Sequence, residues 1–576
     1  MKLIVRDYLC SIKEDGELDD LLVALLLQMG LSIQGGPKKG VAQSGVDLWA
    51  VGRIPPDEED RVYLVSVKRG NLTRTVWDTG TQALRPSLDQ IVDDFIPHRI
   101  PKSFAALKKS VCVAIGGEVE SNVQPSVDGY LEYLESHHDV ATRKLTGDDI
   151  AGLICDHLLS ASVLRGEGQR PLFQALAMVQ EPEASLGPFR QLIASLFTNE
   201  PKNISDWMKQ GRTGILCLAL LDHYCQDANN LEASSIGSEF FRLALADYAE
   251  RATVLPDYSE TKTKKVIHSS IQLAKRIQER YFAKLEPLVR GKYHLSLAVP
   301  GDSILNTNLR LFDLLGRVAS FGLACVEWAQ GGNVPEKSEN GEQDSITLVE
   351  RMRCFVHEMI KNNPALQYPV RDDFCIEVSL TALFLLSTND LKVLHWWLAH
   401  MVDNLHSCLR VGKPFMCVFC DYRRLAEFCH APRDYVKTAL PSSEMIPTLA
   451  VISLSLGFVD IYRQLCELVR RFLPTTNLQL WYPDDADEKQ FIVNGSEHGK
   501  ELVSLPLDDP KRLLEMTLRE CSESPFSSSR FPSWNVLSSC RLYRKPLPIH
   551  YWRPLLETIP VDRLSTILVT GRTNLD

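Results

Sequence analysis

The sequence predicts an α/β domain over residues 1–145, followed by a large, mainly α-helical region with a few short strands near the C-terminus. Two observations support this prediction. Up to residue 145, apolar segments of strand length alternate with segments of helical periodicity, as in a sheet covered by helices. From residue 146 to about residue 475 helical periodicity with short loops prevails, and segments typical of strands return only after it.

The predicted α/β domain begins with an amphipathic helix and a hairpin. Apolar side chains recur at helical spacing over residues 17–30, and Gly30 is expected to end this helix. Residues 45–52 and 62–70 are rich in valine, leucine and aromatic side chains, and both are predicted to be strands. The polar segment 53–60 between them is expected to form the turn of the hairpin.

Three further elements complete the predicted domain. Ser87-Leu88-Asp89-Gln90 has the spacing of a capping box and is expected to open a helix that runs through Phe95. The apolar run at residues 111–117 has the length of a strand, and residues 127–137 show a helical pattern. Helix, hairpin, helix, strand and helix together predict an α/β sandwich of single-domain size.

The remainder of the chain is predicted to be helical. The segment from Thr146 to Asp149 has a second capping-box spacing and marks the start of this region. Residues 331–345, rich in Gly, Glu, Ser and Asn, are interpreted as a linker or exposed loop. This linker divides a helical domain over 146–330 from a mainly helical domain over 346–576, which is expected to sense a trigger or bind a partner. Short strands are expected at residues 478–482, 490–493 and 501–507.

Composition limits the classes of function. At 576 residues the chain is too long for one hydrophobic core. A net charge of -10 excludes a protein that coats nucleic acid over its whole surface, so any DNA contact is expected to be local. The sequence has no Gly-x-x-x-x-Gly-Lys-Ser/Thr phosphate loop and so no visible ATPase of its own. The first residues do not form a signal peptide, no apolar segment spans a bilayer, and 15 cysteines without a regular framework fit a reducing cytoplasm.

One cysteine cluster has the spacing of a metal site. Cys417-x-x-Cys420, with Cys429-His430 behind it, offers four ligands of the kind that bind zinc. The residues between the two pairs have a helical pattern, whereas structural zinc sites usually lie in short Gly-rich knuckles. We therefore interpret these cysteines as small buried apolar side chains, with zinc binding as the alternative.

Asp47 and Lys68 are the principal candidates for a functional site. Asp47 lies early in the first predicted strand and Lys68 lies at the end of the second. Side-chain alternation places Ser66 and Lys68 on one face of that strand, and Asp19 lies in the first turn of the preceding helix. A carboxylate can hold a divalent cation, and a lysine can orient or help to deprotonate a water molecule, which suits phosphodiester cleavage. The alternative is an ordinary hairpin in which Asp47 and Lys68 are surface charges.

These segments resemble the PD-(D/E)xK nuclease superfamily, and the Mrr-type restriction endonucleases in particular. The family pattern is a helix with an acid, a Gly-x-Asp strand and a strand that ends in Glu-x-Lys or Gln-x-Lys. Asp19, Asp47 and Lys68 match it, whereas Ser66 stands at the Glu or Gln position. The resemblance covers about residues 1–145 and implies a restriction-endonuclease-like fold. It also implies a Mg²⁺ (or Mn²⁺) ion held by Asp47, Asp19 and the Val67 carbonyl, with Asp47, Lys68 and Ser66 in the catalytic set.

Basic residues near the predicted strands are candidates for contacts with nucleic acid. Lys38, Lys39, Arg69 and Arg74 lie in segments that flank the strands. Lys and Arg contacts to phosphates supply most of the non-specific affinity of a protein for nucleic acid. Beside a metal site they predict a groove that follows the phosphate backbone; the alternative is four scattered, solvated charges.

The predicted layout indicates a nuclease whose activity is restrained. A nuclease head joined to a long helical region resembles bacterial anti-phage defence effectors, which often act with a partner ATPase. By this resemblance the chain is a DNA endonuclease, with DNA favoured over RNA, that is triggered through a protein partner and forms oligomers in the cytoplasm. The competing hypothesis is a non-catalytic interaction or scaffold protein, with Ser66 marking a degenerate site and the helical region as the working part.

Overall fold

The computed structural model describes most of the chain as two compact units. The described residues are 2–12, 17–36, 44–80, 83–158, 169–298, 303–330, 341–412, 416–428, 438–483, 491–493, 500–523, 532–548, 551–552 and 556. The first unit contains Met1–Phe241 and Tyr248–Leu273, and the second contains Arg242–Asp247 and Ala274–Asp576. Two long helices, α11 (Glu232–Ala252) and α12 (Glu260–Val289), contribute residues to both units.

The first unit contains a mixed five-stranded sheet with the strand order β1-β2-β3-β4-β5. The first three strands are antiparallel neighbours, and the pairs β3-β4 and β4-β5 are parallel. The strands are β1 (Ser32–Gly35), β2 (Leu48–Gly52), β3 (Arg61–Lys68), β4 (Lys108–Ile115) and β5 (Val140–Leu145). In the β2-β3 hairpin Leu48 pairs with Val65 and Gly52 with Arg61, so the polar segment between the strands is the hairpin connection.

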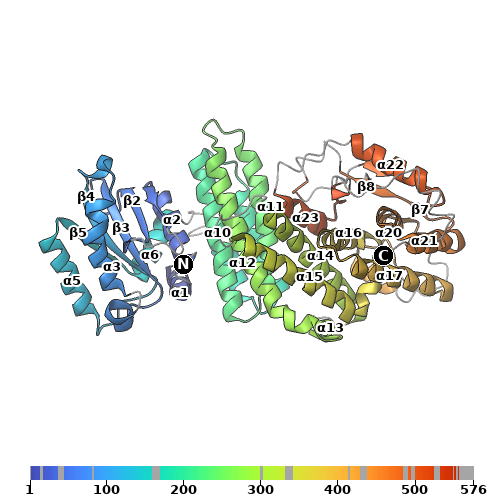
Figure 1. The fold of residues 1–576 in the computed structure, drawn as a ribbon, viewed down its shortest axis with the longest axis horizontal. Coiled ribbons are helices and arrows are strands. Elements are labelled where there is room, and N and C mark those ends of the chain that lie inside the picture. The colour runs from blue at the N-terminus through green and yellow to red at the C-terminus, as the bar shows by residue number, and fades with distance from the viewer. Residues whose placement is uncertain are drawn as a thin grey trace. The chain divides into compact units, whose positions relative to one another are not determined.

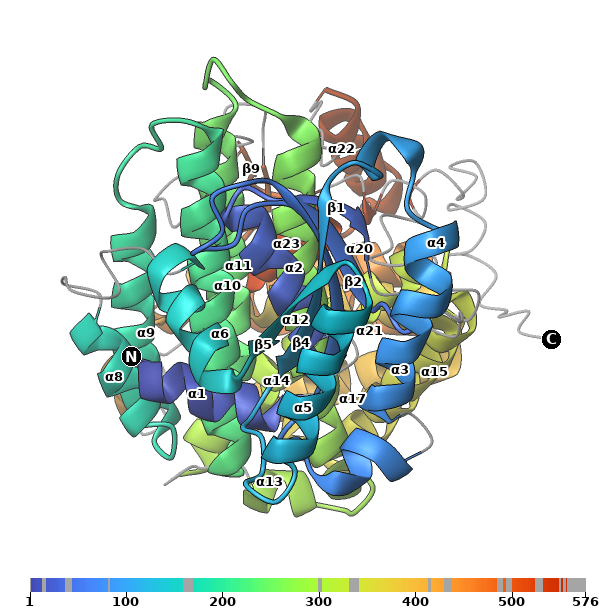
Figure 2. The same ribbon diagram turned by 90° about the vertical axis from the view of Figure 1, so that its left-hand side faces the viewer.

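Helices lie on both faces of this sheet (Figures 1 and 2). One face is contacted by α3 (Leu84–Gln90) and α5 (Gln124–His137). The other is contacted by α2 (Asp19–Gln28) and α6 (Gly147–Leu153), and α1 (Lys2–Ser11) packs on α6. The shorter helical segments of this part are η2 (Thr75–Thr79), η3 (Ile91–Phe95), α4 (Ile96–His98), η4 (Lys102–Phe104) and η5 (Ile154–Leu158).

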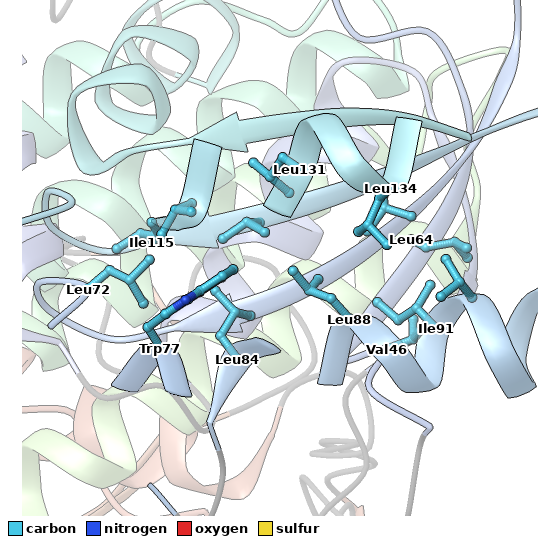
Figure 3. Close-up of a cluster of buried hydrophobic side chains, with 14 of the residues drawn as sticks. Val46, Leu64, Leu72, Trp77, Leu84, Leu88, Ile91, Ile115, Leu131 and Leu134 are labelled. Atoms are coloured by element: carbon cyan, nitrogen blue, oxygen red, sulfur yellow. The ribbon is translucent and has the colours of Figure 1, made fainter. Parts of the chain in front are cut away.

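The principal hydrophobic core of the α/β domain lies between the sheet and the helices α3, η3 and α5 (Figure 3). From β3 it takes Val62 and Leu64, whereas the intervening Tyr63 belongs to the opposite face. This alternation is the expected consequence of the two-residue repeat of a strand. Because both faces are covered, every residue of β3 after Arg61 is buried, charged Lys68 included.

The rest of the first unit is helical. Its helices are α8 (Gln169–Ala177), α9 (Pro182–Phe197), α10 (Ile204–Asp227) and the parts of α11 and α12 named above. α10 begins at an N-cap, where the Asn203 side chain accepts a hydrogen bond from the Asp206 N–H. Trp207 is fully buried on the same helix, and its indole donates to the Tyr248 carbonyl at 3.0 Å.

The second unit is also mainly helical. Its central helix α14 (Ile304–Ala329) contacts α15 (Gly341–Asn362), α16 (Cys375–Ser387) and α23 (Ser533–Tyr543). The other helical elements are α13 (His294–Ala298), η6 (Pro364–Gln367), η7 (Asp372–Phe374), α17 (Leu391–Val411), α18 (Tyr422–Phe428), α20 (Met445–Ser455), α21 (Val459–Phe472) and α22 (Pro510–Glu523). Short strands form two-stranded pairs: β6 (Ser442–Ser443) with β7 (Asn477–Leu478), and β8 (Leu480–Tyr482) with β9 (Lys500–Leu502).

The coarse prediction of the fold is confirmed: a small N-terminal sheet with helices, a helical remainder and short C-terminal strands. Some details of the prediction are wrong. Ser87 does not cap a helix, because α3 begins at Leu84 and the Ser87 hydroxyl donates to the Ala83 carbonyl at 3.1 Å inside its first turn. Residues 491–493 form a turn where a strand was expected. Of the predicted linker, residues 331–340 lie outside the described residues, and 341–345 belong to α15.

Candidate functional site

Gly45 determines how the chain enters strand β2. Its φ of +78° lies in the left-handed region, which glycine adopts without strain. A Cβ at this position would lie 1.9 Å from the Ser87 carbonyl oxygen of α3, so no other residue fits without a shift of the backbone. The next residues then reach the sheet, where the Asp47 N–H donates to the Val65 carbonyl at 2.9 Å.

The Asp47 carboxylate lies at the point where β2 and β3 stop pairing. The last backbone pair of the hairpin at this end is Leu48 with Val65. Beyond it, one oxygen of the Asp47 carboxylate accepts hydrogen bonds from the Val67 N–H at 2.7 Å and from the Ser66 hydroxyl at 3.3 Å. The Asp47 carboxylate thus replaces the next backbone carbonyl of β2 as the hydrogen-bond acceptor. These bonds hold the carboxylate at the C-terminal end of β3.

The same geometry indicates the direction of the Val67 carbonyl. The N–H and C=O groups of one strand residue point to the same side of the strand. The Val67 N–H points to Asp47, whereas the Lys68 carbonyl accepts from Gly116 beside β4 at 2.9 Å. The Val67 carbonyl therefore points to the side of β3 that carries the Asp47 carboxylate.

Three of the other predicted site residues, Lys68, Ser66 and Asp19, are buried. Lys68 is 8% exposed and Ser66 is 1% exposed, and Asp19 in the first turn of α2 is 5% exposed. Charged side chains are seldom buried to this extent unless they are paired or functional. The alternative in which Lys68 is a surface charge is therefore wrong. The structure brings Asp47 together with Ser66, and the convergence of Asp19 and Lys68 on the same point stays a prediction.

A pair of neighbouring loops surrounds this end of the sheet and was not predicted as part of the site. The Gly117 N–H donates to the Gly70 carbonyl at 2.8 Å, and the Glu118 N–H donates to the Asn71 side chain at 3.0 Å. A Cβ on Gly117 would lie 2.8 Å from the backbone carbonyl of Gly70, so a glycine is needed here. The glycine pair after the apolar run of β4 was the available sequence signal.

The predicted basic residues are only partly described. Arg69 follows β3 directly and is exposed, and Arg74 is the exposed N-cap residue of η2. Both belong to the segment that continues from the C-terminal end of β3. Lys38 and Lys39 lie outside the described residues.

A second group of possible metal ligands was not predicted. Asp7 of α1 and His223 and Asp227 of α10 offer ligand atoms that all lie within 4.8 Å of one another. The His223 Nε2 atom lies 3.7 Å from a carboxylate oxygen of Asp7 and 3.5 Å from one of Asp227. His223 is buried and both aspartates are exposed. Only the His-Asp spacing within α10 is visible in the sequence, because Asp7 is brought in by the fold.

The predicted Mg²⁺ site and the cysteine cluster differ in their donor atoms. Asp47, Asp19, the Ser66 hydroxyl and the Val67 carbonyl offer oxygen alone, which is the donor set that Mg²⁺ prefers. These residues therefore fit the predicted ion. In the cysteine cluster, for which zinc binding was the alternative, the prediction of buried apolar cysteines is confirmed for Cys417 and is wrong for Cys420, which is exposed; Cys429 and His430 lie outside the described residues.

Comparisons with known proteins leave the family open. No protein-family model, curated protein or solved structure matches the chain. Within the described part of the chain, every helix is too short or too polar to cross a membrane.

Proposed function

We propose that the N-terminal α/β domain is a metal-dependent nuclease of the PD-(D/E)xK type, and that its substrate is DNA. The observation that carries the proposal is the position of the Asp47 carboxylate. It lies where β2 and β3 separate, next to the Val67 backbone and the Ser66 hydroxyl, on a strand that ends in buried Lys68. The order of α2 with Asp19, β2 directly after Asp47 and β3 with Lys68 agrees with the family pattern named above.

Each residue has a definite role in this proposal. Asp47, with Asp19 and the Val67 carbonyl, would hold Mg²⁺ or Mn²⁺. The bound ion would stabilise negative charge on the scissile phosphate. Lys68, which is buried, would orient or help to deprotonate the attacking water. Ser66 holds Asp47 by a hydrogen bond. Exposed Arg69 and Arg74 would contact the phosphate backbone.

The helical part of the chain has a role in the same proposal. It would restrain the nuclease until a trigger or a protein partner, such as an ATPase, binds, as in anti-phage defence. On this view the isolated protein cleaves slowly. The second candidate function is a non-catalytic interaction protein, and the specific observation in its favour is Ser66. This neutral side chain stands where the family has Glu or Gln, and a hydroxyl is a weaker metal ligand than a carboxylate.

A plasmid-nicking assay with Mg²⁺ and with Mn²⁺ tests the proposal. Asp47→Ala should abolish nicking and metal binding. Lys68→Ala should abolish nicking but leave metal binding in place, because its role is toward water and phosphate. Asp60→Ala and Lys108→Ala are matched controls at the opposite end of the same strands, where both side chains are exposed and form surface ion pairs. Both controls should nick like the unaltered chain.

Ser66→Glu separates the two candidate functions. It restores the family's acidic ligand, so in a nuclease it should keep or raise the nicking rate if the ion offsets the added charge. If the unaltered chain and Ser66→Glu bind neither ion and nick neither single- nor double-stranded DNA or RNA, the chain is not a nuclease. The scaffold hypothesis then takes its place.

A further inference from the structure

The second unit contains a pocket that the nuclease proposal does not use. It lies between α16, α20, β8, α22 and the segment that follows α23 (elements labelled in Figure 1). Isoleucine, valine and leucine supply six of the 15 lining residues, and Trp481, Tyr482 and Trp552 add aromatic rings.

Glu444 supplies the one carboxylate among the residues that line this pocket. Glu444 is the N-cap residue of α20, and Thr448 lies one turn further on the same face of that helix. Glu444 accepts a hydrogen bond from the Cys375 thiol at 3.7 Å, and among the described residues it forms no ion pair. Ser379 and Thr517 add hydroxyl groups to the lining. The pocket thus combines an apolar body with a single acidic group.

The neighbouring carboxylates are all better satisfied than Glu444. Arg544 donates to both oxygens of Glu377, at 2.5 and 3.0 Å, and to Asp373 at 2.9 Å. Asp373 also pairs with Arg371. Asp372 accepts from the Ser443 hydroxyl at 2.6 Å and from the Glu444 N–H at 2.7 Å. The guanidinium groups of this cluster are therefore engaged by the other acids, and the charge of Glu444 is left to the pocket.

The electrostatics of Glu444 agree with this geometry. Burial, together with the charges of Asp372 and Asp373, raises the pKa of Glu444 from 4.5 to about 7. An ionised buried carboxylate is costly when it has no cation beside it. A bound cation would remove that cost, and the aromatic rings nearby add a further attraction for a cation.

We propose that this pocket is a binding site for a small organic cation, with an aromatic or aliphatic body in the apolar part and an amine or amidine group at Glu444. The ammonium or amidinium group donates charge-assisted hydrogen bonds to the carboxylate. Trp481, Tyr482 and Trp552 contact the body of the ligand. This assignment is independent of the nuclease proposal, because no residue of the α/β domain takes part in it.

Calorimetric titration of the full chain with two isosteric probes tests the assignment. Tryptamine carries an ammonium group where tryptophol carries a hydroxyl, and the indole body is the same. At pH 8 tryptamine should bind about tenfold more tightly or better, as a charge-assisted hydrogen bond in a buried site implies. Glu444→Gln keeps the shape but removes the charge, so the preference should disappear. The control Glu427→Gln, an exposed glutamate on α18, should keep it.

A pH titration of the unaltered protein makes the test independent of any variant. Between pH 8 and pH 6 the preference for tryptamine should fall, because Glu444 takes up a proton while an aliphatic amine stays charged. The other groups that face Glu444 are Asp372, Asp373, Arg544 and the Cys375 thiol, and Arg544 stays charged throughout. Equal affinity for both probes at pH 8, or no binding of either up to millimolar concentration, would overturn the proposal.

Discussion

At the scale of single residues, both candidate sites rely on charges that the fold removes from water. Lys68 and Asp19 are almost fully buried in the α/β domain, and Glu444 is partly buried in the second unit. Such groups lower stability unless another group offsets their charge. In the second unit this offset is visible for Asp313. The buried guanidinium groups of Arg317 and Arg541 both pair with its carboxylate, which is 44% exposed, and they lower the pKa of Asp313 to about 2.

The pKa values of Glu444 and Asp372 are raised, whereas that of Asp313 is lowered. These raised values predict that the stability of the second unit depends on pH. Burial raises the pKa of Asp372 from 3.8 to about 6, and that of Glu444 from 4.5 to about 7. An acid with a higher pKa in the folded state binds its proton more tightly when folded. Its contribution to stability is complete below the unfolded pKa and is lost as the pH rises through the folded pKa. A rise from pH 5 to pH 8 should therefore lower the free energy of unfolding of the second unit.

Glu444→Gln checks this sign. At pH 8 the variant should be more stable than the unaltered chain by about 1–3 kcal/mol, since it removes a buried charge. At pH 5 the two should be nearly equal, because Glu444 is then protonated. Urea unfolding at both pH values measures the difference. The same effect of Glu444→Gln at pH 5 and at pH 8 would show that Glu444 does not titrate between them.

The sequence predicted single residues where their chemistry is local. Asp47 and Ser66 lie on adjacent predicted strands, so their contact follows from pairing of the hairpin. Glu444 could not be recognised, because the acids and arginines around it come from distant segments and only the fold brings them together. The Asp7-His223-Asp227 group was missed for the same reason.

At the scale of elements, the conformation of Gly45 positions the candidate active site. Gly45→Ala should destabilise the α/β domain by about 2 kcal/mol or more, because the residue has a positive φ and its Cβ would overlap α3. Nicking should also fall, since Asp47 follows two residues later. Thermal unfolding and the nicking assay measure the two effects.

Gly129→Ala is the matched control for this prediction. Gly129 lies in α5, it is exposed, and a Cβ there would meet nothing within 4 Å. Alanine is the better helix former, so this variant should gain about 0.5–1 kcal/mol. If Gly45→Ala were as stable and as active as Gly129→Ala, the close approach of residue 45 to α3 would not occur in solution.

Elements were predictable in proportion to the strength of their hydrophobic pattern. The helix α2 and the strands β2, β3 and β4 have clear apolar patterns and were all expected. The strands β1 and β5 were missed. Both lie at the edges of the sheet, and most of their residues are only partly buried, so their sequences alternate weakly. The capping box at Thr146 was found because its geometry is local.

At the scale of the whole molecule, packing contacts show which segments after residue 145 belong with the sheet. Hydrophobic patterns alone did not reveal these contacts. Beyond the predicted boundary at residue 145, α6 contacts β4 and β5, and η5 contacts α6 and α2. Ile150, Ile154 and Leu158 of these helices are all at most 1% exposed. α1 packs on α6, and Lys2 reaches Asp148 at 2.8 Å. The sequence pattern thus changes from mixed to helical at residue 146, although the helices that follow still pack against the α/β domain.

This packing predicts which fragment of the head folds. A fragment of residues 1–158 should be soluble and should melt cooperatively. A fragment of residues 1–145 should melt at a much lower temperature or aggregate, because it exposes the part of the sheet that α6 contacts and the side of α1 that packs on α6. Thr146→Ala in the longer fragment should cost about 1 kcal/mol through loss of the capping box, well below the effect of deleting both helices. Equal melting temperatures for the two fragments would show that α6 and η5 add nothing to the stability of the head.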